Sequence, residues 1–141
     1  MRGTSYVLTA RAAADLRHAR AWSRARWGPE LTNRYFEDLH KGAQYIAKKH
    51  ASLRARADLA GGTALLLYPV REHFLVYEPL APEFIAILAV IRRGRDVPSI
   101  LQKWAPPLRR ELGEVRAMIA RGDIQPPALR DGRTRHKGGR K

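Results

Sequence analysis

The stretch "RWGPEL", residues 26–31, divides a long helical pattern into two parts. Glycine tolerates the left-handed backbone that closes a helix. Proline suits the first turn of the next helix, where its missing N–H has no partner to lose. Gly28 and Pro29 therefore predict that one helix ends and another begins here. Because the connection is so short, the two helices are expected to lie antiparallel, as a helical hairpin.

Each arm of this predicted hairpin carries a stripe of apolar or small residues at helical spacing. The first arm runs from Ala10 to Trp27 and the second from about Pro29 to His50. The expected buried positions are Ala12, Leu16, Ala19, Ser23 and Trp27 in the first arm, and Tyr35, Leu39, Ala43 and Ile46, flanked by Phe36 and Ala47, in the second. The two stripes need another apolar surface to cover.

Short segments rich in β-branched and aromatic residues supply that surface. The predicted strands are residues 5–8, 64–70, 73–77 and 84–91, separated by a loop at 52–62, a tight turn at Arg71-Glu72 and a proline-containing turn at 78–83. The order predicts an α+β fold in which the antiparallel helical hairpin packs on one face of a mostly antiparallel sheet of about four strands.

The C-terminal third adds a helical extension. Residues 97–104 are predicted as a short helix, and Pro106-Pro107 is predicted to open a second helix that ends at Gly122. Its apolar stripe is Leu108, Leu112, Val115 and Ile119. This stripe either packs on the domain's own sheet or hairpin, or it occupies or extends a partner's binding groove. The predicted organisation is a domain at 1–104, an amphipathic helix at 105–124 and a basic flexible tail at 125–141.

The charge balance favours an acidic partner. The chain of 141 residues has 27 Lys and Arg against 13 Asp and Glu, a net charge of +14. Residues 130–141 hold six basic and one acidic residue, so +9 belongs to the rest of the chain. Such an excess favours an acidic protein, nucleic acid or another anionic surface. The chain lacks cysteine, and its longest apolar run is far shorter than the roughly 20 residues of a membrane helix. A cytoplasmic location and no membrane association are therefore expected.

Three arginines follow the last predicted strand, in "RRGRDVPSIL", residues 92–101. One interpretation is structural: Arg95 pairs with Asp96 or caps exposed strand carbonyls, and Arg92 and Arg93 are solvated. The other is that all three contact a target or an antitoxin, since arginine offers five directed donors and a planar face. Asp96 and Pro98 are predicted to shape the turn, because aspartate accepts local N–H bonds and proline ends a strand.

These segments together resemble the ParE branch of the ParE/RelE superfamily, the toxins of type II toxin–antitoxin modules. The matching motifs are "YVLTARAAADL" (6–16), "WGPE" (27–30), "YPVREHFLVYEP" (68–79) and "RRGRDVPSIL" (92–101). Their order and spacing cover residues 5 to about 102 without a large gap. The resemblance implies a toxin that inhibits DNA gyrase and is neutralised by a ParD-like antitoxin in a heteromeric complex.

Two alternatives to this function remain open. RelE-like relatives are ribosome-dependent mRNA endonucleases, and their chemistry needs cations on the central strand and an acid/base group near the C-terminal turn. Phe74 stands at the strand position, and apolar residues around Ile100 stand where those relatives have a tyrosine, so the resemblance does not carry the ribonuclease residues. The second alternative is a basic adaptor that binds nucleic acid directly, with a steep salt dependence.

Acid/base catalysis has few candidates in the sequence. His73 could act as a general base, and Tyr68 and Tyr77 could donate protons, but each is more typical of packing in a strand. No metal site, cofactor or nucleophile–base set can be assembled, so a binding inhibitor is expected rather than an enzyme. His73 or a tyrosine beside clustered cations in a nucleotide-sized cleft would contradict that expectation.

Overall fold

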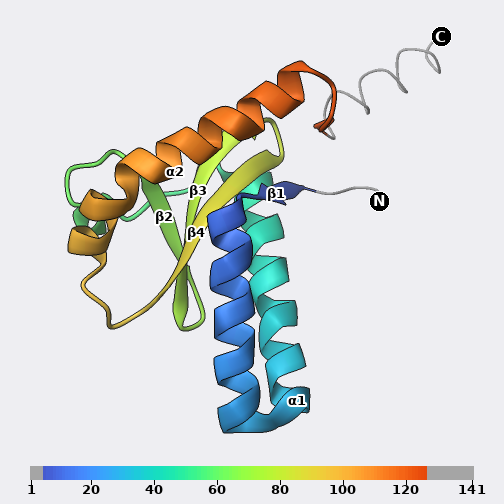
Figure 1. The fold of residues 1–141 in the computed structure, drawn as a ribbon, viewed down its shortest axis with the longest axis vertical. Helices are drawn as coiled ribbons and strands as arrows, with labels where there is room; N and C mark the ends of the chain where they lie inside the picture. Colours follow the sequence, from blue (N-terminus) through green and yellow to red (C-terminus); the bar gives the residue numbers. More distant parts are fainter. Residues whose placement is uncertain (1–4, 127–141) are drawn as a thin grey trace, which may run out of the picture.

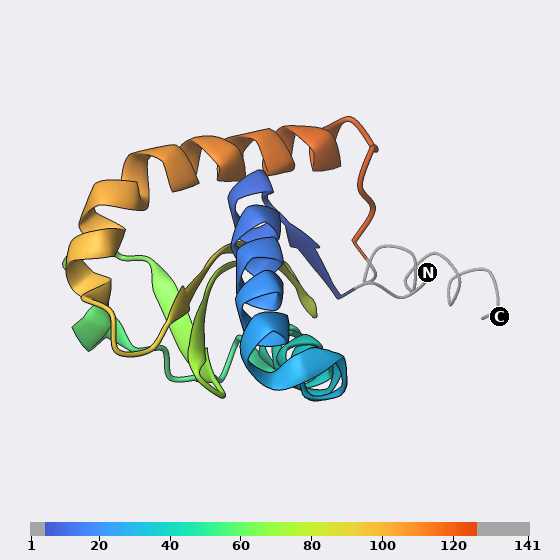
Figure 2. The ribbon, with the colours of Figure 1, turned by 60° about the horizontal axis from the view of Figure 1, so that its bottom comes forward.

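The computed structural model describes residues 5–126. It has three layers, with a central sheet between two layers of helix (Figures 1 and 2). The expected basic tail at 125–141 lies, beyond residue 126, outside these residues. The elements are β1 (Tyr6–Leu8), α1 (Ala10–Lys49), η1 (Ala57–Leu59, a short 3-10 helix), β2 (Leu66–Val70), β3 (His73–Ala81), β4 (Phe84–Arg92) and α2 (Val97–Ala120).

The sheet has the strand order β1-β4-β3-β2. β1 runs parallel to β4, and the two remaining pairs are antiparallel. β4 is therefore a central strand, and its eight residues from Phe84 to Ile91 are all buried. A strand covered on both faces reads as a continuous apolar run, which is what this segment shows. The predicted α+β fold with a mostly antiparallel sheet is confirmed.

The helical hairpin forms where the Gly-Pro pair predicts it. α1 contains a kink at Gly28, whose φ of +86° is left-handed, and Pro29 starts the second arm. The two arms lie side by side against one face of the sheet, and the tip with the kink extends beyond the strands (Figure 1). The second arm approaches β2 so closely that a Cβ on Gly42 would lie 2.5 Å from Cγ1 of Val70.

The predicted stripe of the second arm is the buried face of that arm. Tyr35, Leu39, Ala43, Ile46 and Ala47 are all less than 5 % exposed. In the first arm Ala12 and Ser23 are buried, but Trp27 is 40 % exposed, against the prediction. Trp27 lies at the hairpin tip, past the end of the sheet, so no strand is available to cover it.

α2 covers the opposite face of the sheet from α1 (Figure 2). Alternate residues of β4 point to the two layers, as strand geometry requires: Ile85 and Ile87 pack with α1, and Ala86 and Leu88 pack with α2. The core on the α1 side contains Ala12, Ala43, Ile46, Ala47, Leu75, Tyr77, Ile85, Ile87 and Val90. The larger core on the α2 side includes Leu67, Phe74, Val76, Leu88, Ile91, Val97, Leu101, Ala105 and Leu108.

The predicted break before Pro106 is absent, and one helix runs from Val97 to Ala120. The expected division between residues 104 and 105 falls inside this helix. Proline removes the N–H bonds to the carbonyls four residues earlier, those of Gln102 and Lys103. Both residues are exposed, so water can satisfy those carbonyls, and Figure 2 shows that the helix bends. Ala105 and Leu108 are buried on either side of the prolines, which keeps both halves on the sheet.

The predicted turn at residues 78–83 is also wrong, because β3 continues to Ala81. The register between β3 and β4 shifts at Val76/Tyr77 and again at Pro79/Ala81. A bulge is one of the places where a strand tolerates a residue without an N–H. Pro79 is therefore accommodated at an irregularity, and the connection to β4 shrinks to Pro82 and Glu83.

Across residues 5–126, no helix combines the length and the apolar character that crossing a bilayer requires.

Candidate functional site

The start of α1 closes the free edge of β4. β1 is only three residues long, so β4 continues past its partner. There the Thr9 hydroxyl donates to the carbonyl of Leu88 at 3.0 Å, and Oδ2 of Asp15 accepts the N–H of Val90 at 2.9 Å. Burial raises the pKa of the Asp15 carboxyl, and the Val90 N–H and Arg11 oppose that rise. These two contacts hold the first arm of α1 against the strand.

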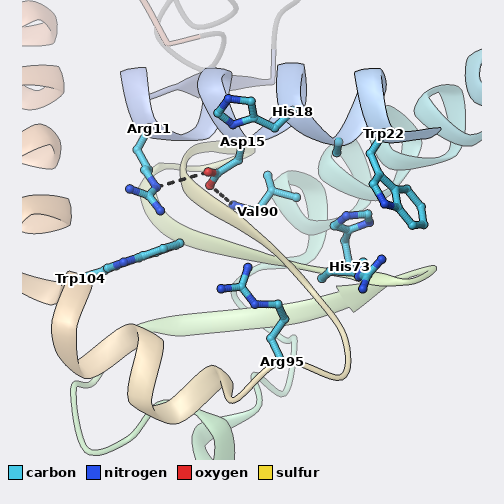
Figure 3. A pocket seen from close by; sticks show the side chains of 10 residues that line it. Arg11, Asp15, His18, Trp22, His73, Val90, Arg95 and Trp104 are labelled. Atoms are coloured by element: carbon cyan, nitrogen blue, oxygen red, sulfur yellow. Dashed lines mark hydrogen bonds and ion pairs between the residues drawn. The ribbon is translucent and has the colours of Figure 1, made fainter. Parts of the chain in front are cut away.

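A pocket of about 530 Å³ lies beside this contact, between α1, the end of β4 and the start of α2 (Figure 3). Four elements and one turn supply its walls. The lining residues are Arg11, Asp15, His18, Ala19 and Trp22 from α1, His73 from β3, Val90 and Arg92 from β4, Arg95 from the following turn, and Trp104 from α2.

Two of the pocket's arginines are stacked on its two tryptophans. The guanidinium carbon of Arg11 lies 3.4 Å from the ring centroid of Trp104, and that of Arg92 lies 4.8 Å from the ring of Trp22. Such cation–π contacts fix the plane of a guanidinium and leave its edge donors available. Nε of Arg11 is 3.3 Å from Oδ1 of Asp15 as an ion pair, without hydrogen-bond geometry. The guanidinium of Arg95 has no partner among residues 5–126.

His73 is the titratable group at the base of the pocket, and it is only 8 % exposed. Nδ1 lies 2.6 Å from the phenol oxygen of Tyr35, which also accepts the Glu72 N–H at 3.0 Å. The Tyr35 phenol thus links the imidazole to the backbone of the β2–β3 turn. Burial, and then the charge of Arg92, lowers the pKa of His73 to about 4, against a smaller opposing effect of Glu72. His73 is therefore neutral at pH 7.

One arrangement would contradict the binding inhibitor expected from the sequence: a histidine or tyrosine beside clustered cations in a nucleotide-sized cleft. The structure meets part of that condition. His73 does lie beside Arg92 and Arg95 in a pocket of nucleotide size. Its chemistry does not match a general base, because Nδ1 is already engaged by Tyr35 and a pKa of about 4 is far from the operating range. Tyr77 is 1 % exposed in the core, where burial raises its pKa, so it reaches no ligand. Tyr68 packs near Tyr45, with ring centroids 6.3 Å apart.

The three arginines of the 92–95 turn separate in space. Arg92 and Arg95 line the pocket, whereas Arg93 does not. Arg93 donates from Nη1 to the carbonyl of Arg71 at 3.1 Å and lies over Phe74. All three are exposed, and none forms an ion pair within residues 5–126.

Asp96 and Pro98 occupy the first turn of α2. Oδ1 of Asp96 accepts the N–H of Ser99 at 3.4 Å as the helix N-cap, and Pro98 lies in the first turn, where its missing N–H is not needed. The Asp96 carboxylate is thus directed to its own helix and not to Arg95.

The apolar stripe of α2 faces the protein's own sheet. Leu108 and Val115 are buried, and Leu112 and Ile119 are half-buried. Polar contacts add to this packing: Oε1 of Glu111 accepts the Arg11 backbone N–H at 3.1 Å, and Arg116 pairs with Glu78 at 3.0 Å. Of the two interpretations of the stripe, internal packing matches this arrangement.

The sequence interpretation missed the α1 wall of the pocket. Arg11, Asp15, His18 and Trp22 are spaced by four, three and four residues, which places them on one face of a helix next to the buried stripe. That spacing could have predicted the α1 wall from the sequence. No sequence pattern predicts that Trp104 and His73 line the same pocket, because only the tertiary fold brings them together. Within the described residues, no group of three His, Cys, Asp or Glu side chains could hold a metal ion.

Comparisons with known proteins agree with this architecture. A family model described as the ParE toxin of the type II toxin–antitoxin system parDE matches residues 6–97. A curated relative, Toxin ParE from Escherichia coli, is 29 % identical over 94 residues, which cover 67 % of this chain and 89 % of the relative. A solved structure described as "Chromosomal ParDE TA system from P. aeruginosa" has the same fold, with a TM-score of 0.51 and 18 % identity over 63 % of this chain and 95 % of the other. Since the family model spans well over half of the sequence, the chain belongs to the ParE toxin family of type II toxin–antitoxin systems.

Proposed function

We propose that this toxin inhibits DNA gyrase by binding it, and that a ParD-like antitoxin neutralises the toxin in a heteromeric complex. Membership of the ParE family supports both parts, and the similar solved structure from P. aeruginosa is that of a ParDE system. Gyrase acts on DNA in the bacterial cytoplasm, which is the location the proposal requires.

The observation that carries the proposal is the exposed arginine turn. Arg92, Arg93 and Arg95 extend from the end of the central strand, and no acidic side chain of the described region neutralises them. Arginines left unpaired on a surface are available for directed bonds to a partner's carboxylates or phosphates. No catalytic set accompanies them among the described residues, which favours inhibition by binding over RelE-like cleavage of mRNA.

Exposed apolar side chains near the hairpin tip suit an antitoxin segment. Trp22 and Trp27 are each 40 % exposed and Leu31 is 50 % exposed, and their neighbours include Arg26 and Arg34. Large aromatic side chains beside arginine are the composition typical of binding hot spots. An acidic amphipathic segment of the antitoxin would bury these rings while opposite charge speeds the encounter.

A supercoiling assay with purified gyrase tests the proposal. The toxin is expected to inhibit supercoiling, added antitoxin to restore it, and a triple variant with Arg92, Arg93 and Arg95 changed to alanine to inhibit at least tenfold less. The matched control changes three exposed cations outside the 92–95 turn to alanine: Arg54, Lys103 and Arg110. This control variant is expected to keep full inhibition. Unaffected supercoiling combined with cleaved mRNA on the ribosome would overturn the proposal in favour of the RelE-like alternative.

A further inference from the structure

The pocket between α1, β4 and α2 extends beyond the residues that the proposed function uses. Arg92, Arg95 and Trp22 are shared with it, whereas Arg11, His73 and Trp104 are not. Its walls combine three guanidinium groups with two indole rings, contributed by elements far apart in the sequence (Figure 3). We propose that it binds a nucleoside monophosphate, with the phosphate held by Arg92 and Arg95 and the base placed against the Arg11–Trp104 stack at the other end, and that it does so without cleaving the ligand.

The charge of the pocket matches a phosphate dianion. Arg11, Arg92 and Arg95 supply three positive charges, and Asp15 supplies one negative charge. The Asp15 carboxylate is already engaged, since it accepts the Val90 N–H and lies against Arg11. The net positive charge therefore has no counterpart within the described part of the chain, and guanidinium groups bind phosphate through paired, charge-assisted hydrogen bonds.

The donors are positioned before any ligand arrives. Stacking on Trp104 and Trp22 fixes the planes of Arg11 and Arg92, which reduces the entropy lost when each binds an anion. Arg95 lies opposite them on the turn after β4, and within residues 5–126 its guanidinium has no bond to give up.

The size of the pocket separates a nucleotide from a smaller anion. A volume of about 530 Å³ lies within the range of small-molecule sites and is far too large for a carboxylate or a bare phosphate. Figure 3 shows Trp104 and Trp22 at opposite ends of the pocket. At the Trp104 end the guanidinium of Arg11 lies over the ring, and planar bases stack on aromatic rings and on guanidinium planes alike.

The same geometry explains why the ligand stays intact. Cleavage next to a phosphate needs a base to take a proton from the attacking oxygen. Nδ1 of His73, the imidazole at the base of the pocket, is already engaged by the Tyr35 phenol, and burial lowers the pKa of the ring to about 4. An imidazole so held and so weakly basic is poorly suited to deprotonate a hydroxyl group.

Titration of the full-length toxin with AMP and GMP, without gyrase, tests this proposal independently of the proposed function. The backbone N–H signal of Arg95 and the indole N–H signal of Trp104 are expected to shift in ¹H–¹⁵N spectra, with the backbone N–H of Tyr45, outside the pocket, as the internal reference. Inorganic phosphate and the bare nucleosides are expected to bind at least tenfold more weakly than the nucleotides. The nucleotide is expected to be recovered unchanged.

Variants at two arginines separate the pocket from general surface charge. Arg95→Ala is expected to weaken AMP binding at least tenfold, because an exposed residue without a partner in the described region can be removed without unfolding the protein. Arg110→Ala removes the same charge from the exposed surface of α2 and is expected to change the affinity less than twofold. Equal losses in both variants, equally tight binding of inorganic phosphate, absence of any shift at millimolar nucleotide, or release of phosphate from AMP would each overturn the proposal.

Discussion

The phenol oxygen of Tyr35 joins His73 to the backbone: it lies 2.6 Å from Nδ1 of the imidazole and accepts the Glu72 N–H at 3.0 Å. Tyr35 belongs to the second arm of α1, and His73 opens β3. One side chain thus satisfies two polar groups at the turn between β2 and β3. Burial and the nearby charge of Arg92 favour the neutral imidazole, so the stability of the fold depends on pH.

Stability is expected to fall as the pH is lowered from 6.5 to 4. The pKa of His73 is lowered to about 4 in the folded protein, so the unfolded chain binds the proton more tightly. The contribution of neutral His73 is complete above pH 6.5 and is lost as the pH falls through this interval. At about 1.4 kcal/mol per pH unit, the shift corresponds to roughly 3 kcal/mol.

Urea denaturation at several pH values measures this dependence. His73→Gln removes the titrating group while keeping an acceptor, and it is expected to flatten the curve between pH 6.5 and 5. His18→Gln, on the exposed face of α1, is the control for the loss of one histidine side chain. Identical slopes for wild type and His73→Gln would contradict the assignment of a buried neutral imidazole.

Asp15 is expected to matter for stability through one backbone bond. Asp15→Ala leaves the Val90 N–H without its acceptor next to the core, at a cost of about 1–3 kcal/mol. Asp15→Asn keeps an acceptor oxygen and should lose less. Asp38→Ala breaks an exposed ion pair with Arg71 and should cost no more than about 1 kcal/mol. Chemical denaturation of the three variants gives the ranking, and a larger loss in Asp38→Ala than in Asp15→Ala would be inconsistent with it.

Two glycine-to-alanine changes are expected to have opposite effects. In Gly42→Ala the new Cβ would lie 2.5 Å from a methyl group of Val70, a stiff side chain that cannot move away without shifting β2. Gly113 in α2 has open space around it, so Gly113→Ala should stabilise the protein by up to about 1 kcal/mol through helix propensity. Thermal unfolding of both variants gives the comparison. A stabilised Gly42→Ala protein would show that the arm and the strand are not in close contact.

Leu108 is expected to be the most costly position of the α2 stripe. It is 1 % exposed in the core on the α2 side, so Leu108→Ala should cost about 2–5 kcal/mol. Leu112 is half-buried, and Leu112→Ala should cost clearly less. The difference in the free energy of unfolding is the measurement. Equal, small costs at both positions would indicate that the stripe is free to serve a partner, contrary to its packing on the sheet.

Local signals in the sequence predicted the parts of the fold that local chemistry decides. The Gly28-Pro29 break, the stripe from Tyr35 to Ile46 and the apolar run of β4 each depend on a few neighbouring residues, and each is present in the structure. Proline was misleading twice. Pro79 is held at a register shift, and Pro106-Pro107 lie within a helix that the sheet keeps continuous. In both places packing by distant residues outweighs the local preference.

The pocket could be predicted only in part for the same reason. The arginines of the 92–95 turn are recognisable as a cluster, and the helical spacing of Arg11 and Asp15 was available. The stacking of Arg11 on Trp104 joins residues more than ninety positions apart, so no short pattern reports it.

The parallel pairing of β1 with β4 affects the order in which the chain can fold during translation. Tyr6 pairs opposite Ile85, so the earliest strand to leave the exit tunnel waits for nearly the entire sheet to follow it. β4 also provides the centre on which both helical layers rest. A polypeptide that ends before residue 84 therefore lacks the strand that joins β1 to the sheet and on which both helical layers pack.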